Sequence, residues 1–276
     1  MDIIENINGS VIQHGPHNDR IYLMKPNMDD TPGLIGMLDD LASRKGYGKI
    51  FAKIPAHLWH AYQSAGYIKE AAVPRFYGDG TEVFFISKYF SAKRQKVQID
   101  KKLSKIIETA ESASADTYAV TAESKQVILS CKPSDAEELS KLYRQVFKTY
   151  PFPIQEPSYL KQMMETDVLY FCIRIRNQIV STAAAEIDTV NQNAEMTDFA
   201  SLPKWRGMGF AGMILKHMER KMGDLGIMTV YTIARAASHG MNMVFRKNGY
   251  TYSGLLKNNT QICGSIQNMT VWYKQL

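Results

Sequence analysis

Hydrophobic and polar residues in the C-terminal half of the chain follow two periods, one typical of strands and one typical of helices. Strand-like runs are expected at residues 127–131, 169–174, 179–187, 194–201, 227–233 and 270–273. Helix-like spacings are expected at residues 134–148, 157–166, 210–222 and 241–247. The order β-α-α-β-β-β-α-β-α-β predicts an α/β (α+β) domain, with a mixed and mostly antiparallel sheet flanked by helices.

The first 90 residues carry a similar mixture of patterns. Strands are expected at residues 21–24, 49–54 and 82–90, and helices at residues 31–45 and 56–64. In residues 91–125 the pattern is lost, and residues 88–105 contain seven basic residues and one acid, Asp100. We interpret this stretch as a basic linker with one helix at about 101–111, whose charges are solvated. The expected organisation is a small domain at 1–90, the linker at 91–125 and a larger domain at 126–276.

Composition narrows the class of protein. The chain has 276 residues, of which 45% are hydrophobic and 22% are charged, and its formal net charge is +6. These values are typical of a globular protein. The basic excess forms no continuous cluster, so nucleic acid is not an expected partner. We find no apolar run that could span a bilayer and no secretory signal, and therefore expect a cytoplasmic protein with no membrane partner.

Cysteine and histidine give no sign of a metal site. Cys131, Cys172 and Cys263 lie far apart in the chain and lack metal-ligand spacing, which favours reduced thiols. His57 and His60 fall on one helical face, but no acid or cysteine is placed to complete a metal site there. We therefore expect no metal cofactor.

Residues 206–212, Arg-Gly-Met-Gly-Phe-Ala-Gly, join a predicted strand to an amphipathic helix. Glycines at such a junction expose backbone N–H groups, and the first N–H groups of the helix have no partners within it. Together these groups favour a bound phosphate, and Arg206 adds a positive charge. The spacing also satisfies the dinucleotide pattern G-x-G-x-x-G. That pattern, however, requires the loop in the first βαβ unit of the domain, with an acid at the end of the next strand. Here four strands precede the loop, and the next strand ends in Ile-Ala-Arg at 233–235, without an acid.

Two segments resemble the GNAT acetyltransferase superfamily. Residues 206–211 match its pyrophosphate loop, R/Q-x-x-G-x-G/A, and residues 241–250 match a second segment of the family, Met-x-x-Val-Phe-x-Lys-x-Gly-Tyr. The order of strands and helices in residues 126–276 is also similar to the GNAT fold. The resemblance implies acetyl-CoA as a co-substrate.

The resemblance assigns cofactor contacts to particular residues. The strand that ends near Ser201 would carry a bulge and pair with the pantetheine arm. Two positions depart from the family pattern. Ser238 stands where many members have asparagine, with Asn242 one helical turn later. Phe245 stands where many have a tyrosine that protonates the thiolate, so Tyr250, Tyr231 or water would take that role. The implied cofactor residues are Phe199, Ala200, Ser201, Arg206, Gly207, Met208, Gly209, Phe210, Ala211, Gly212, Ser238, Asn242 and Phe245.

Acetyl transfer to an amine requires a neutral nitrogen, whereas a lysine-type ammonium has a pKa near 10.4. A base or a water relay must therefore remove a proton. Asp198 and Glu195, on the strand before the glycine loop, are the expected catalytic carboxylates. They are three residues apart and would face opposite sides of a regular strand, although a bulge can change this. Expected acceptor-binding residues are Tyr150 and Phe152 in a proline-rich loop, together with Glu186 and Tyr231.

The whole chain resembles one GNAT subgroup, the β-lysine N-acetyltransferases. The segment 195–203, Glu-Met-Thr-Asp-Phe-Ala-Ser-Leu-Pro, and the segment 150–153, Tyr-Pro-Phe-Pro, carry this resemblance. It implies transfer of acetyl to the ε-amine of β-lysine, which gives the compatible solute Nε-acetyl-β-lysine used against osmotic stress. An acidic group would then recognise the remaining amine, and a basic or polar group the carboxylate. The alternatives are another amine, such as a polyamine or a protein lysine, and a non-catalytic acyl-CoA-binding regulatory module.

The N-terminal half resembles part of the C-terminal half. Residues 64–68 followed by 82–89 are similar to residues 247–251 followed by 268–273. We therefore expect residues 1–90 to be a degenerate, partial copy of the same fold. This copy has no glycine loop, so it should not bind CoA. It is expected to pack on the catalytic domain or to form the surface of a homodimer.

Overall fold

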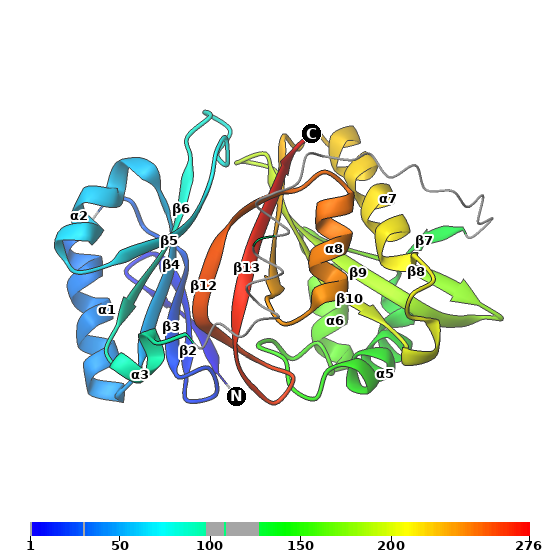
Figure 1. The fold of residues 1–276 in the computed structure, drawn as a ribbon, viewed down its shortest axis with the longest axis horizontal. Coiled ribbons are helices and arrows are strands. Elements are labelled where there is room, and N and C mark those ends of the chain that lie inside the picture. Colours follow the sequence, from blue (N-terminus) through cyan, green and yellow to red (C-terminus); the bar gives the residue numbers. More distant parts are fainter. Residues whose placement is uncertain (1, 30, 98–107, 109–126) are drawn as a thin grey trace.

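The computed structural model describes residues 2–29, 31–97, 108 and 127–276, and it contains two mixed sheets that lie side by side (Figure 1). The expected linker helix at 101–111 lies, apart from residue 108, outside the described residues. Within the described part of the chain, no helix is long and apolar enough to cross a membrane. The α+β class expected from the sequence is confirmed in both halves.

The C-terminal sheet has seven strands in the order β12-β13-β11-β10-β9-β8-β7. Only β10 and β11 are parallel among its neighbours, because helix α7 carries the chain from one to the other. The strands are β7 (Ile128–Ser130), β8 (Val168–Ile175), β9 (Gln178–Asp188), β10 (Asn193–Ser201), β11 (Thr229–Arg235), β12 (Thr251–Ile262) and β13 (Ser265–Gln275).

Helices cover both faces of this sheet. Helices α7 (Phe210–Asp224) and α8 (His239–Lys247) bury their apolar stripes on one face. Helices α5 (Ala136–Val146) and α6 (Pro157–Met164) pack on the other face. Short 3-10 turns precede two of these helices, at η2 (Pro133–Asp135) and η3 (Pro203–Trp205). This arrangement leaves the splayed ends of β10 and β11 between the helices as the place where a ligand can enter.

The N-terminal sheet has six strands in the order β1-β2-β3-β4-β6-β5. It repeats the order of the six strands from β8 to β13, including a parallel pair, β3 and β4, that is joined through a helix. Its elements are β1 (Ile3–Ile7), β2 (Ser10–Gly15), β3 (Arg20–Lys25), α1 (Thr31–Lys45), β4 (Lys49–Pro55), η1 (Ala56–Leu58), α2 (Trp59–Ser64), β5 (Ile68–Val73), β6 (Val83–Tyr89) and α3 (Ala92–Gln95).

The two faces of the N-terminal sheet have different neighbours. Helices α1 and α2 cover the outer face and enclose a hydrophobic core (Figure 1). The inner face carries Tyr22, Phe51 and Phe85, which belong to the same core cluster as Tyr231 and Met269 of the C-terminal half. A single hydrophobic core therefore joins the two sheets.

The edge strands β5 and β12 meet where the sheets join. Ala72 and Ser253 exchange two hydrogen bonds, of 2.8 and 2.6 Å. Gly254 permits this approach, since a Cβ atom there would lie 2.1 Å from the carbonyl oxygen of Glu70. The contact fixes the inner face of the N-terminal sheet over the C-terminal domain.

The structure differs from the sequence-based elements mainly by adding strands. β1, β2, β5 and β12 were not expected, because their polar and apolar residues do not alternate cleanly. β13 is much longer than the expected strand at 270–273. In the linker, Arg94 is buried rather than solvated, and it pairs with Asp19 at 3.0 Å. The basic linker is therefore not solvated along its whole length.

Candidate active site

A cavity of about 1010 Å³ lies between the two halves of the molecule. The C-terminal domain contributes the bulged end of β10, the end of β11, the glycine loop and the start of α8. The N-terminal sheet contributes residues of β3 and β4, and the proline-rich loop at 150–152 lines another part. The predicted cofactor residues that line it are Phe199, Ala200, Ser201, Arg206, Gly207, Met208, Gly209, Phe210, Ala211, Gly212, Ser238 and Phe245.

The glycine loop presents free backbone at the start of α7. Gly207 and Gly209 have φ values of +80° and +76°, in the left-handed region that glycine adopts without strain. Nothing lies within 4 Å of the position that a Cβ atom would take on either residue. The amide of Met213 makes the first bond of the helix, to Gly209 O at 3.1 Å. The amides just before it are thus the unpaired N–H groups of a helix start, which favour an anion.

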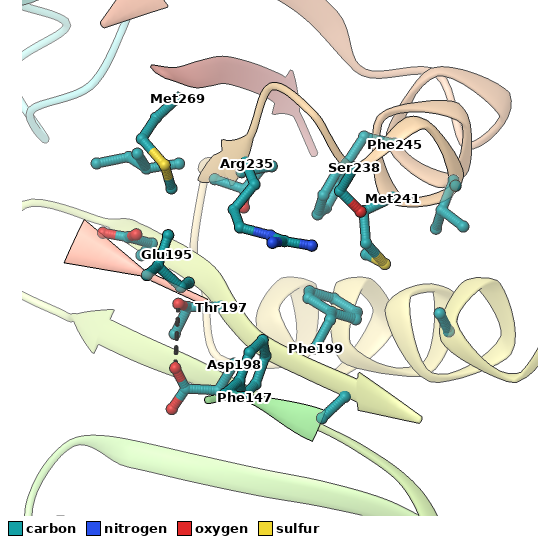
Figure 2. A pocket seen from close by; sticks show the side chains of 18 of the residues that line it. Phe147, Glu195, Thr197, Asp198, Phe199, Arg235, Ser238, Met241, Phe245 and Met269 are labelled. Atoms are coloured by element: carbon teal, nitrogen blue, oxygen red, sulfur yellow. Dashed lines mark hydrogen bonds between the residues drawn. The ribbon is translucent and has the colours of Figure 1, made fainter. Parts of the chain in front are cut away.

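Strands β10 and β11 separate at the centre of the cavity. Their parallel pairing ends with Glu195 opposite Tyr231. Beyond that point β10 carries the predicted bulge, since its register with β9 shifts between Thr197 and Ala200. Asp198 lies in this bulge with φ +55°, an uncommon conformation for a residue with a side chain. The bulge lets both Asp198 and Glu195 line one cavity, although they are three residues apart (Figure 2).

Asp198 is the more enclosed of the two expected catalytic carboxylates. Its side chain accepts a hydrogen bond of 2.5 Å from the Tyr150 hydroxyl and a longer one, of 3.4 Å, from Thr197 (Figure 2). Burial raises the pKa of Asp198 to about 6, against the opposing effect of the Tyr150 hydrogen bond. A carboxylate that titrates near 6 is suited to take a proton at neutral pH.

Glu195 lies in a network that connects the two halves. Lys53, on β4, donates a hydrogen bond of 3.0 Å to the Tyr231 hydroxyl. Burial raises the pKa of Glu195, and the Lys53 ammonium together with a hydrogen bond from Tyr231 opposes this rise. Burial disfavours the charge of Lys53, but Tyr22, Tyr231 and Glu195 raise its pKa well above the ordinary value. Lys53 therefore stays charged and balances Glu195.

Glu186 adds a third carboxylate to the same cluster. It lies directly opposite Glu195 on the neighbouring antiparallel strand, so the two side chains share one face of the sheet. Its side chain is exposed to the open cavity but surrounded by the protein on its other sides. Burial and the nearby carboxylates of Glu195 and Asp198 raise its pKa. Three acids that line one cavity create a site that favours an organic cation.

Aromatic side chains enclose the carboxylates. Tyr150 and Phe152, expected at the acceptor site, both line the cavity, as does Phe147 at the end of α5. The rings of Phe147 and Tyr150 lie 4.8 Å apart. The expected acceptor residue Tyr231 is 3% exposed and does not line the cavity, and its hydroxyl accepts a hydrogen bond from Lys53. These walls suit an aliphatic chain that ends in a charged group.

The structure also places Asn242 and Tyr250 away from the cavity wall. Asn242 was expected to contact the cofactor, but it is 1% exposed and absent from the cavity wall. Its amide oxygen accepts from Thr270 and Trp272 at 2.6 and 2.9 Å, so it anchors α8 to β13. Tyr250, one candidate for protonating the thiolate, also lies outside the cavity and packs against Phe245.

Sequence patterns did not identify several residues of the cavity wall. Arg20, Tyr22 and Lys53 come from the N-terminal sheet, which was expected only to pack or to dimerise. A signal was present, because basic and aromatic residues alternate with aliphatic ones along β3 and β4. Arg235, at the end of β11, extends into the cavity in Figure 2 and was considered only as evidence against a dinucleotide site. No metal-binding group of three or more His, Cys, Asp or Glu is found among the described residues.

The chain is similar to several known proteins. The ribosomal-protein-alanine N-acetyltransferase of Brucella melitensis aligns with 54% of this chain and 99% of its own, at 15% identity and a TM-score of 0.48. The acetyltransferase (GNAT) family matches residues 136–250. The β-lysine N(6)-acetyltransferase of Methanococcus maripaludis is 38% identical over 274 residues, 99% of each chain. A second β-lysine N(6)-acetyltransferase, from Methanosarcina mazei, is 28% identical over 88% of this chain and 97% of its own. The chain therefore belongs to the GNAT family of acetyltransferases.

Proposed function

We propose that this protein transfers the acetyl group of acetyl-CoA to the ε-amine of β-lysine. The observation that carries the proposal is the cluster of Glu186, Glu195 and Asp198 at the point where β10 and β11 separate, beside the glycine loop. Such a cluster attracts an ammonium substrate to the place where a thioester would lie. Similarity to a β-lysine N(6)-acetyltransferase over 99% of both chains supports β-lysine as the acceptor.

Acetyl-CoA would enter between β10 and β11. The unpaired amides of the glycine loop would hold its pyrophosphate, with Arg206 at the entrance. The pantetheine arm would pair with the backbone of 199–201, beyond the point where β10 stops pairing with β11. Ser238 and Phe245 would line the path of the arm. This places the thioester near Asp198.

Asp198 would act as the general base. It takes the proton of the acceptor ammonium, and the neutral nitrogen attacks the thioester carbonyl. The C–S bond then breaks, the nitrogen loses a second proton to give the amide, and a proton transferred through water converts the departing thiolate of CoA into a thiol. Phe245 cannot donate this proton and Tyr250 lies outside the cavity. Glu195 and Glu186 would hold the second ammonium of the acceptor.

We also propose a division of the chain into two related domains, residues 1–90 and 126–276, joined by the linker 91–125. The identical order of six strands in the two sheets supports a shared origin. Residues 26–29, between β3 and α1, are Pro-Asn-Met-Asp and contain no glycine, so the copy has lost the phosphate loop. The N-terminal domain would instead close the acceptor site of its partner domain.

The acceptor also suggests the role of the product. Acetylation removes one positive charge from β-lysine and leaves a neutral zwitterion, a type of molecule that cells can accumulate. We therefore propose that the protein makes a compatible solute in the cytoplasm as part of osmoadaptation, and that it acts without a metal. A homodimer formed through the N-terminal domain remains a separate proposal, which sedimentation of the full chain would test.

Release of free CoA from acetyl-CoA tests the proposed function. β-lysine, α-lysine and spermidine would be compared as acceptors at equal concentration. We expect β-lysine to give the highest kcat/KM. A preference for spermidine would indicate a polyamine acetyltransferase, and tight binding of acetyl-CoA without turnover of any amine would indicate a regulatory module.

A further inference from the structure

The inner face of the N-terminal sheet is unusually basic where it borders the cavity. Arg20 and Tyr22 on β3, and Phe51 and Lys53 on β4, alternate with aliphatic residues that face α1 and α2. The Arg20 guanidinium lies 5.3 Å from the ring centroid of Tyr22, and the Lys53 ammonium lies 5.7 Å from the same ring. The N-terminal domain thus places two cations opposite the carboxylates of β9 and β10.

Arg20 is buried, with 3% of its surface exposed, and it makes an incomplete set of contacts. Its Nη1 donates to the carbonyl oxygen of Asn259 at 2.5 Å and to Thr260 Oγ1 at 3.0 Å. Its Nε is buried without a hydrogen-bond partner. Burial lowers the pKa of Arg20 to about 10, so the group keeps its charge at neutral pH. A buried cation with an unused donor is costly unless an anion completes it.

The other buried basic side chains show what is missing at Arg20. Lys49 pairs with Glu70 at 3.1 Å, and Arg94 pairs with Asp19 at 3.0 Å. Lys53, which is less buried, has Glu195 as its nearby charge. Among the residues that the structure describes, Arg20 has no carboxylate within ion-pair distance. Since Arg20 lines the cavity, the cavity is the place from which an anion can reach it.

We propose that Arg20 binds the carboxylate of the acceptor amino acid, so that the N-terminal domain selects the substrate. This inference rests on the proposed function. The acceptor would extend from the carboxylates near the thioester, which hold its ammonium groups, to Arg20, which holds its carboxylate. Arginine is suited to this role because its planar fork can donate two parallel hydrogen bonds to a carboxylate. A free diamino acid satisfies both ends of the site, whereas a polyamine leaves Arg20 unpaired and a lysine within a protein has no free carboxylate.

The test compares β-lysine with its uncharged carboxamide, β-lysinamide, on three proteins. These are the wild type, Arg20→Gln, and Arg94→Gln as a matched control in which a buried arginine outside the cavity is lost. In the wild type, kcat/KM for β-lysine should exceed that for the amide by about 10- to 100-fold, the range expected for a charge-assisted hydrogen bond. Arg20→Gln should raise the KM for β-lysine and abolish this preference. Its KM for acetyl-CoA should stay unchanged.

The ratio of the two substrates is measured on one preparation, so partial unfolding of a variant does not alter it. Arg94→Gln should lower stability but keep the wild-type ratio. If Arg20→Gln does not fold, Arg20→Lys should give an intermediate ratio, because it keeps the charge and loses the fork. An unchanged ratio in the Arg20 variants, with β-lysine still acetylated, would overturn this inference alone. A wild type that uses spermidine in preference to β-lysine would overturn it together with the proposed function.

Discussion

The Nζ atom of Lys53 lies 3.0 Å from the hydroxyl of Tyr231, and this contact connects the inner face of the N-terminal sheet to the last residue of β11 that pairs with β10. Glu195, opposite Tyr231, shares the same environment. The N-terminal domain is therefore placed to influence the charge of the candidate active site.

Lys53→Met should impair catalysis more than stability. Loss of the ammonium leaves Glu195 without its balancing charge, so the pKa of this carboxyl should rise further. We expect kcat/KM for the acceptor to fall roughly 10-fold or more, the size of one lost charged contact. Steady-state kinetics over a pH series measures both effects. Lys69→Met is the control, since Lys69 is exposed and lies against Phe84, away from the cavity; equal losses in the two variants would contradict the assignment.

Gly209→Val should weaken acetyl-CoA binding. The residue caps α7 at φ +76°, a conformation that a β-branched side chain adopts only under strain, and the added bulk would cover the exposed amides. We expect the KM for acetyl-CoA to rise by about 10-fold or more, the effect of losing a charge-assisted contact. Gly223→Ala, in the exposed part of the same helix, should leave that KM unchanged. An unaltered KM in Gly209→Val would mean that the loop does not hold the pyrophosphate.

Asp198→Asn should inactivate the enzyme and stabilise its fold at neutral pH. Burial raises the pKa of Asp198 from 3.8 to about 6, so the folded state binds a proton more tightly than the unfolded state does. The ionised group therefore costs stability, fully above pH 6 and not below pH 4. We expect a gain of about 1–3 kcal/mol at pH 7 that disappears near pH 4. Thermal unfolding at both pH values measures it.

The same substitution tests the catalytic role. If Asp198 is the base, wild-type kcat/KM should rise with pH through about 6 as its carboxyl ionises. Asp198→Asn should then reduce kcat by about 100-fold or more, the range typical of a lost general base. A variant that keeps most of its turnover would transfer this role to Glu195 or to water. Glu195→Gln, measured in parallel, separates these outcomes.

Asn242→Ala should reduce stability without a specific effect on acetyl-CoA. Its amide oxygen is the acceptor for Thr270 and Trp272, and both donors are buried. We expect a loss of about 2–4 kcal/mol, since two buried donors would lack partners. Chemical denaturation measures the loss. A folded variant with a raised KM for acetyl-CoA would instead support the cofactor contact that the sequence predicted for Asn242.

Local patterns in the sequence predicted most of the strands and helices of the C-terminal domain. The glycine loop, the helix that follows it and the bulged strand are each defined by neighbouring residues, so their positions could be predicted. β12 could not, because it is an edge strand whose packing on β5 depends on Gly254 and a distant carbonyl group. The hydrophobic periodicity of a segment indicates which of its own residues are buried. It does not identify the element that packs against them.

The N-terminal residues of the candidate site were not predicted, for the same reason. Arg20 and Lys53 lie more than 130 residues before the carboxylates that they face, and neither belongs to a motif. Asn242 was misassigned because its position suggested a cofactor contact, while its actual partners lie on β13. In both cases the deciding contacts are between residues far apart in the chain.

The central claim is tested most directly by identifying the product formed from acetyl-CoA and β-lysine. After incubation with the full chain, mass spectrometry counts the acetyl groups and NMR locates them. We predict one acetyl group, on the ε-nitrogen, formed in proportion to the CoA released. An acetyl group on the β-nitrogen, or no acetylated β-lysine despite bound acetyl-CoA, would contradict the account.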